Sequence, residues 1–451
     1  MKREHWKSKL GFMWAAIGSA VGLGSIWRFP YITGQNGGAV FVLLFCLFLI
    51  GISLPIMLSE IVIGRKTQSN PSDAYLKIGK TSFWNRLGTM QVVTGFLVSI
   101  FYSVICGWTF GYCIETLIGN TAHLTSSQEA KLFWLSCLSS NRWIVGYQLG
   151  FILMSVAVLF SGVQKGIEAT NKILMPLLFI FLLLLALAGL QMPGASKGLK
   201  FLFTPDWSML NGKVILLALG QAFFGLSVGQ GTMITYGSYL KEKDNLFKIS
   251  IPVTLAIVVV SLLAGIAIFT AVFSVGGSPS EGADLVFQTL PVVFSSMSGG
   301  YLFSVLFFSL ILFAGLTSQI SAMEPFISYL IDHKRFSRHK AVLLCGSIVA
   351  LFGVPTGLSF GPLSYIKIFD TSIFDALLFL CVNILIPVGA LSAVLLIGWK
   401  TPIKYFFANL QKGSTLDLSQ NTLTANTLKL IVRYICPLVI FIILLNLFYA
   451  L

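Results

Sequence analysis

Charged residues are scarce in this sequence of 451 amino acids. Asp, Glu, Lys and Arg together account for 10% of the chain, whereas a soluble domain usually contains about 25%. Hydrophobic residues account for 56%, and their runs of about 20 residues are long enough to cross a hydrocarbon core of roughly 30 Å. This composition excludes an ordinary soluble protein and predicts an all-α integral membrane protein.

Cysteine and histidine are also few, with seven and four residues respectively. Most of the cysteines lie inside apolar runs, where a free cysteine behaves as a small hydrophobe. Their spacing fits neither a metal cluster nor a disulfide framework. The sequence also lacks a recognisable Ser-His-Asp set and a phosphate-binding loop, so we expect that the protein is not an enzyme.

The apolar runs predict eleven membrane spans within one domain that covers residues 1–451. These spans lie near 10–33, 38–64, 87–118, 143–162, 168–190, 212–238, 249–274, 300–331, 341–358, 372–398 and 428–450. The third and eighth are long enough to tilt or to extend beyond the bilayer.

Lys and Arg are distributed unevenly between the two sides of these spans. The N-terminus and every second connection, with the flanking span ends, hold 23 of the 30 basic residues. An excess of Lys and Arg marks the cytoplasmic side. We therefore expect a cytoplasmic N-terminus and, with an odd number of spans, a C-terminus outside. The net charge of +14 is then a topology signal, and we expect no nucleic-acid partner.

Glycine clusters interrupt the first and sixth spans, within 18–30 and 224–231. Glycine costs about 1 kcal/mol in a helix interior, and a single cluster would more simply indicate close helix packing. Two clusters five spans apart instead indicate an inverted-repeat transporter with discontinuous helices around a site at the bilayer midplane. The expected repeats cover about 10–190 and 212–398, followed by an extra span near 428–450.

Several short motifs carry a resemblance to a known family. They occupy residues 2–6, 18–30, 36–38, 64–65, 234–239 and 313–318. Through them the sequence resembles the sodium:neurotransmitter symporter family, specifically its bacterial amino-acid transporters, over nearly the whole chain. The resemblance implies a five-plus-five inverted repeat of the eleven-span type, alternating access and sodium-driven uptake in a bacterial plasma membrane. We expect a monomer or a weak dimer.

The resemblance also implies a substrate pocket. In the family, backbone groups at the break in span 1 and a tyrosine, here Tyr102, hold the substrate carboxylate, and helix N-terminal ends favour an anion. Gly22 stands where monoamine transporters carry an aspartate, which favours an amino-acid substrate. Gln230 and Ala322 replace bulkier apolar residues of leucine-transporting relatives, which indicates a neutral substrate larger or more polar than alanine. The expected substrate-binding residues are Ser19, Ala20, Leu23, Gly24, Val98, Tyr102, Phe224, Gly225, Ser227, Gln230, Ser318 and Ala322.

Sodium is the coupled ion that the family implies. Its second site matches here, with carbonyls of Gly18, Val21 and Ala314 and hydroxyls of Thr317 and Ser318. The alternative is that these two hydroxyls only bond their own helix, as membrane Ser and Thr often do.

The first sodium site and the chloride site of the family do not match this sequence. At the first site, Ser25, Gly225 and Ile257 stand where the family has Asn, Thr and Asn. At the chloride site, Phe45, Gly225 and Ile257 replace the family's Tyr, Ser and Asn, while Ser261 and Gln221 are kept. We expect coupling to one sodium without chloride, unless the register of span 7 differs.

Residues matching the family's gates lie on both sides of the pocket. On the outer side we expect Arg28 to pair with Asp375 above an aromatic lid of Phe224 and Tyr102. The expected inner gate consists of Arg3, Trp6, Tyr239 and Asp332, beside Ser238 and Glu324. Glu60, inside an apolar span, could satisfy unwound backbone of span 6 or take part in coupling.

Two other functions remain open from the sequence. The first is the same fold driven by protons or by exchange, which sodium dependence of uptake would distinguish. The second is a membrane sensor that binds amino acids without transporting them. Against the sensor stand the gate residues and the lack of a soluble signalling domain.

Overall fold

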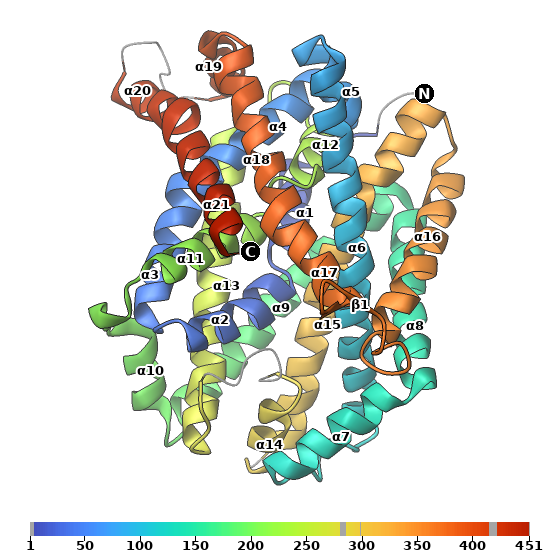
Figure 1. Cartoon of the computed structure of the whole chain (residues 1–451), viewed down its shortest axis with the longest axis vertical. Helices are drawn as coiled ribbons and strands as arrows, with labels where there is room; N and C mark the ends of the chain where they lie inside the picture. The colour runs from blue at the N-terminus through green and yellow to red at the C-terminus, as the bar shows by residue number, and fades with distance from the viewer. Residues whose placement is uncertain (1–3, 280–285, 298, 415–421, 451) are drawn as a thin grey trace.

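The computed structural model describes residues 4–279, 286–297, 299–414 and 422–450, and this part of the chain is almost entirely helical. In Figure 1 most long helices run along the long axis of the molecule. The helices α5 and α19 lie toward one end, which we call the N-terminal end because the described chain begins there, while α7, α10 and α14 lie toward the opposite end.

The first half of the chain forms twelve helical elements. They are α1 (Lys9–Ala20), η1 (Gly24–Arg28), α2 (Phe29–Gln35), α3 (Ala39–Phe48), η2 (Leu49–Ser53), α4 (Leu54–Thr67), α5 (Pro71–Gly79), α6 (Ser82–Leu117), α7 (Ser127–Ser139), α8 (Asn141–Phe160), η3 (Val163–Glu168) and α9 (Ala169–Leu190). The η elements of this half are π-helical turns, and η2 and η3 each continue into the helix that follows to make one span.

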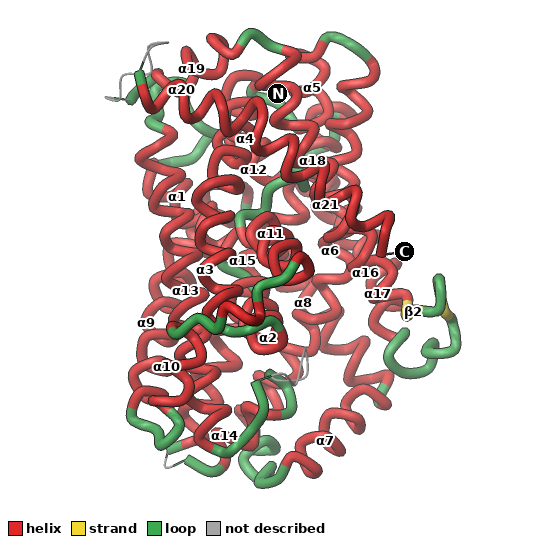
Figure 2. The backbone as a smooth tube through the Cα atoms, turned by 60° about the vertical axis from the view of Figure 1, so that its left-hand side comes forward, coloured by secondary structure: helices red, strands yellow, loops and turns green. Residues whose placement is uncertain are grey.

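The second half contains the remaining helices and a short hairpin. They are α10 (Ala195–Phe203), η4 (Trp207–Met209), α11 (Gly212–Gly225), α12 (Thr232–Gly237), α13 (Leu246–Ser274), α14 (Thr289–Ser295), α15 (Gly300–Lys334), α16 (Arg338–Leu358), β1 (Lys367–Ile368), β2 (Thr371–Ser372), α17 (Ile373–Phe379), η6 (Leu380–Leu385), α18 (Ile386–Leu395), η7 (Leu396–Lys400), α19 (Ile403–Gln411), α20 (Leu423–Leu430), η8 (Ile431–Ile435) and α21 (Cys436–Ala450). The two strands pair antiparallel, and Figure 2 shows this hairpin projecting from the side of the helical body.

Nine helical segments in the described residues are long and apolar enough to cross a membrane. A tenth is the pair 9–20 and 24–35, which bends by 47° at its break. The remaining predicted span begins with α11, which has only 14 residues and continues past a second break into α12. Ten segments of the described chain are thus able to span by length and composition, and the broken segment of α11 and α12 lies at the position of the sixth predicted span.

Backbone conformation explains why these two helices stop. After α1, Val21 leaves the helical region with φ −85° and ψ 76°. After α11, Ser227, Gly229 and Gly231 all have positive φ, which the α-helix does not allow. A Cβ on Gly229 would lie 2.1 Å from the carbonyl oxygen of Ile386, so only glycine fits at that position.

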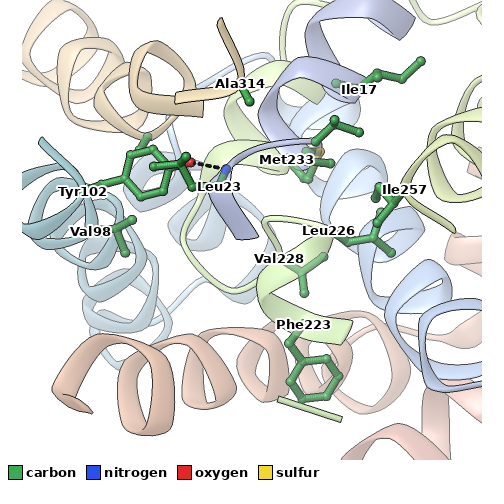
Figure 3. Packing of buried hydrophobic residues seen from close by; sticks show 14 of the residues in the cluster. Ile17, Leu23, Val98, Tyr102, Phe223, Leu226, Val228, Met233, Ile257 and Ala314 are labelled. Carbon is green, nitrogen blue, oxygen red and sulfur yellow. Dashed lines mark hydrogen bonds between the residues drawn. The ribbon is translucent and has the colours of Figure 1, made fainter. Parts of the chain in front are cut away.

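The two breaks meet in the middle of the molecule. The Ser227 hydroxyl donates to the Ser19 carbonyl across them at 2.9 Å. The long helices α6 and α15 pack against each other beside this junction, and α1 packs against α15. Figure 3 shows helices packed around the unwound backbone. Unwound backbone inside a membrane is tolerated only in such protected places.

Candidate functional site

A cavity with an empty volume of about 340 Å³, part of it open, lies at the junction of the two breaks. Ten of the twelve residues expected to bind substrate line it, together with Gly22. The ten are Ser19, Ala20, Gly24, Val98, Tyr102, Phe224, Ser227, Gln230, Ser318 and Ala322. The structure thus brings residues from spans 1, 3, 6 and 8 together around one space.

The other two expected residues, Leu23 and Gly225, do not line the cavity. Leu23 contributes its backbone N–H, which donates to the Tyr102 hydroxyl at 2.9 Å (Figure 3). This bond fixes the tyrosine hydroxyl against the break in span 1. Gly225 lies at the end of α11 and faces apolar side chains away from the cavity.

Side chains of the cavity wall pack closely against the backbone of Gly22. A Cβ on Gly22 would lie 2.1 Å from the Ser318 hydroxyl oxygen and 2.6 Å from the Tyr102 hydroxyl oxygen. Real Cβ contacts are not that short, so a side chain here would displace both groups. The π-helical turn η1 begins two residues later at Gly24, and its N-terminal end borders the cavity, where a negative group is favoured.

Two polar groups in the cavity wall are left without protein partners. The Ser19 hydroxyl and the Gln230 side-chain oxygen are buried and have no hydrogen-bond partner in the described part of the chain. Val98, Phe224 and Ala322 contribute apolar side chains to the cavity wall. A buried, unpaired acceptor costs about 1–3 kcal/mol, so both groups are suited to contact a ligand.

Oxygen atoms converge beside the cavity, where α1 meets α15. The Ser318 hydroxyl donates to the carbonyls of Gly18 at 3.1 Å and Ser19 at 3.2 Å. The Thr317 hydroxyl donates to the carbonyls of Phe313 and Ala314, each at 3.1 Å. Both the ion-binding and the helix-bonding interpretations of these hydroxyls fit those distances. The set of neutral carbonyl and hydroxyl oxygens is the kind that hard cations prefer.

Val21 belongs to the same expected set and lies at the break. Its N–H donates to the Ile17 carbonyl at 2.6 Å, which is the last helical bond of α1. Its own carbonyl follows the end of the helix, where carbonyls lack helical partners.

The region expected to lack the first sodium site is apolar in the structure. Carbon atoms of Ile257, Leu49 and Phe45 all lie 3.8 Å from the position of a Cβ on Gly225. The Ser25 hydroxyl donates to the Ala20 carbonyl at 3.5 Å. Ile257 therefore faces Gly225 as the ungapped register of span 7 predicts, and Figure 3 shows it on the side of the break away from Tyr102.

Comparison with known proteins identifies the family to which this chain belongs. The model of the sodium:neurotransmitter symporter family matches residues 3–144 and 140–450. The chain belongs to this family. It is therefore a sodium-dependent membrane transporter, with sodium as the coupled ion, and the activity of its relatives is transport and not catalysis.

Relatives from several organisms match most of the chain. An uncharacterized sodium-dependent transporter of Bacillus subtilis, YhdH, is 40% identical over 99% of this chain and 98% of its own length. One from Haemophilus influenzae is 36% identical over 88% of this chain and 89% of its own. The crystal structure of MhsT in complex with L-phenylalanine superimposes with a TM-score of 0.92 at 38% identity, covering 98% of this chain and 99% of that one.

The transporter holds Arg28 differently from the expected outer gate. Its guanidinium donates to the Gln221 side-chain oxygen at 2.5 Å and lies 5.3 Å from the Phe224 ring centre. Gln221 in turn donates to the Gly24 carbonyl at 2.7 Å. Asp375 instead bonds Ser372 at the start of α17. The expected Arg28–Asp375 pair is not among the salt bridges of the described residues, because the carboxylate serves its own helix cap.

At the N-terminal end, the side chain of Trp6 packs against residues of α12 and the connection that follows it. It is buried, donates to the Tyr236 carbonyl at 3.0 Å, and contacts the Tyr239 ring edge-on. The Tyr239 hydroxyl donates to Glu324 at 2.7 Å. Trp6 and Tyr239, two residues of the expected inner gate, thus lie in contact with each other in this structure.

The predicted ion pair of this gate can be described only in part. Arg3 lies outside the described residues. Asp332 accepts hydrogen bonds from the backbone and side-chain nitrogens of Asn70 at 2.8 and 3.3 Å, so it also fixes the start of α5.

Arg338 makes an ion pair beside the expected inner gate that the sequence interpretation missed. Its guanidinium binds both oxygens of the fully buried Glu324, each at 3.0 Å, and lies 3.7 Å from Glu4. In the sequence it follows Lys334 and Arg335 and looks like one more cytoplasmic basic residue. Only its pairing with the buried Glu324 distinguishes Arg338 from those neighbours. That pairing is bidentate and therefore geometrically specific.

Glu60 takes the structural role that its position allows. One carboxylate oxygen accepts the Gly229 N–H at 2.8 Å, so it holds the unwound backbone after α11. The other oxygen has no hydrogen-bond partner among the described residues.

A contact outside the membrane spans ties α19 to the connection after α12. Lys412 donates to Glu242, and this hydrogen bond, with the positive charges of Lys412, Lys66 and Arg65, lowers the pKa of the Glu242 carboxyl below its ordinary value. Arg65 donates to the carbonyls of Asp244 and Asn409. The motif arginine therefore anchors α19 and the connection after α12 at the N-terminal end.

Proposed function

We propose that this transporter imports a neutral amino acid together with one sodium ion and without chloride. The observation that carries the proposal is the double position of Ser318. Its hydroxyl lines the cavity and also bonds the Gly18 carbonyl within the oxygen cluster. Substrate and ion would then bind against the same side chain, so that each stabilises the site for the other.

The lining residues favour a substrate without net charge. Tyr102 is the only titratable side chain among those that line the cavity in the described structure. A charged substrate side chain would be buried without a counter-charge, which is costly. The carboxylate of an amino acid fits the end of η1 beside Tyr102, and unwound carbonyls suit its ammonium group. The phenylalanine bound in MhsT supports a substrate of this kind.

The loss of the first ion site is consistent with the loss of chloride. Ile257, Leu49 and Phe45 surround Gly225, and carbon atoms cannot replace the water lost by an ion. An anion beside the first sodium would offset its charge, so removal of both leaves the charge of the region unchanged. One sodium remains, at the cluster of Gly18 and Ser318.

Gln230 would set the preference among neutral substrates. Its unpaired oxygen borders the cavity near Phe224 and Ala322. A substrate side chain with a hydroxyl or amide group would pair with it, whereas a purely aliphatic one would leave it unsatisfied.

The excess of Lys and Arg near the N-terminus supports a cytoplasmic N-terminus in a bacterial plasma membrane.

Uptake by purified transporter in lipid vesicles tests this proposal. We expect a sodium gradient to drive uptake of radiolabelled phenylalanine, with tyrosine and glutamine as competitors. In Gln230→Met, competition by tyrosine and glutamine should weaken roughly five- to tenfold relative to phenylalanine and leucine, because one hydrogen bond contributes about 1 kcal/mol. Gln319→Met is the matched control, since that buried amide donates to the Ser99 carbonyl and does not line the cavity.

The outcomes separate the competing functions. Uptake of a neutral amino acid that proceeds equally without sodium would contradict sodium coupling and favour protons or exchange. Binding without any uptake would favour a sensor. An unchanged competition pattern in Gln230→Met would contradict only the proposed role of Gln230 in substrate preference, and sodium-coupled uptake would stand.

A further inference from the structure

Asn171, the third residue of α9, carries a buried polar atom that the gates and the substrate cavity do not use. The side chain is fully buried. Its amide nitrogen donates to the Ile167 carbonyl at 2.8 Å, which fixes the orientation of the amide. Its oxygen therefore points the other way, and it has no hydrogen-bond partner within the described part of the chain.

The free oxygen of Asn171 lies against Gly18. A Cβ on Gly18 would lie 1.7 Å from that oxygen and 3.1 Å from the Cβ of Thr317. Asn171 and Thr317 thus press on the same face of Gly18, and the Gly18 carbonyl accepts the bond from Ser318. The helix α9 packs against both α1 and α15, so the oxygen sits at the edge of the proposed sodium cluster.

We propose that the Asn171 side-chain oxygen is an additional sodium ligand, contributed by α9. Amide oxygens belong to the hard oxygen ligands that such cations bind, and a cation would satisfy an acceptor that is otherwise costly to bury. The inference rests on the proposed function, because it assumes that sodium binds at the cluster of Gly18, Thr317 and Ser318. It adds a third helix to the two that hold this ion.

The consequence is a direct link between the ion and α9. The same helix begins after Glu168, which accepts from the backbone N–H of Lys7 at 2.8 Å and from the hydroxyl of Ser8 at 3.1 Å. Sodium bound by Asn171 would hold α9 against the break in span 1. Loss of the ion would release that hold, while the contacts near Ser8 remain.

Equilibrium binding of radioactive sodium to the purified transporter, without substrate, tests the proposal. Asn171→Leu keeps the branched shape of the side chain and removes the oxygen, and we expect it to weaken sodium binding roughly tenfold or more. Asn171→Ala removes the oxygen without adding bulk and should behave alike. Gln148→Met is the matched control, because that buried amide donates to Ser103 at 3.0 Å and has an unpaired oxygen in another part of the molecule.

Three results distinguish the possible roles of Asn171. The thermal stability of each variant is measured without sodium, so that a loss of folding is not mistaken for a loss of sodium binding. Weaker sodium binding in both Asn171 variants with an unchanged control supports the ligand. A second result would be wild-type sodium binding in both Asn171 variants but weakened binding in the double variant Thr317→Ala/Ser318→Ala. The Asn171 oxygen would then make only a Cα–H···O contact with Gly18 and would not bind sodium, while the proposed function would remain intact. Wild-type binding in all of these variants overturns the sodium site itself.

Discussion

Alanine at both Thr317 and Ser318 is expected to abolish sodium-dependent uptake. The two hydroxyls lie in the cluster where α1 meets α15, 3.1 Å from carbonyls of Ala314 and Gly18. A contact to a charged group contributes about 1.5–3 kcal/mol. Removing two such contacts should therefore weaken sodium binding roughly a hundredfold or more. Sodium titration of uptake in vesicles, with amino acid at fixed concentration, measures the loss.

Ser321→Ala provides the comparison for this double variant. Ser321 lies one turn further along α15, is buried, and donates to the Ser318 carbonyl at 2.7 Å. It loses the same kind of hydroxyl without touching the cluster, so sodium dependence should be retained. Full sodium dependence in the double variant would show that these hydroxyls serve only their own helix.

Alanine at Gly22 should eliminate high-affinity substrate binding. The added methyl group would lie 2.1 Å from the Ser318 oxygen and 2.6 Å from the Tyr102 oxygen. Forcing a methyl group into a filled space costs about 1–3 kcal/mol, and here the displaced groups are the proposed ligands of carboxylate and sodium. We expect amino-acid affinity to fall by roughly 10- to 100-fold, measured by competition binding at saturating sodium.

Gly220→Ala is the control for this substitution. Gly220 lies on the other broken helix, α11, and a Cβ there would meet no atom within 4 Å. The same methyl group should be harmless and could slightly stabilise the helix. Equal substrate affinity in the Gly22 and Gly220 variants would contradict the placement of the substrate carboxylate at the break.

Hydrophobic runs and glycine clusters were enough to predict the architecture. The apolar runs mark the spans because lipid leaves few alternatives to a helix. The positive φ values of Ser227, Gly229 and Gly231 explain why span 6 breaks where its glycines cluster. Family motifs then placed ten of the expected substrate residues around one cavity, although composition and spacing alone could not have done so.

Side-chain partners were harder to predict, because they depend on the rotation of each helix. Arg28 needs a polar partner, but whether Gln221 or Asp375 reaches it depends on where α11 and α17 end relative to η1. Asp375 follows Ser372 by three residues, a capping spacing that is visible in the sequence. Arg338 and Asn171 gave no signal, because their contacts with Glu324 and Gly18 depend on how α16 packs against α15 and α9 against α1.

The ratio of sodium to amino acid taken up tests the central proposal most directly. Radioactive sodium and a radiolabelled neutral amino acid would be measured in the same vesicles, with chloride present or replaced by gluconate. Under the proposal we expect one sodium per amino acid in both media, because oxygen atoms cluster at Ser318 and the region around Gly225 is apolar. A ratio of two, a requirement for chloride, or amino-acid uptake without sodium entry would contradict it.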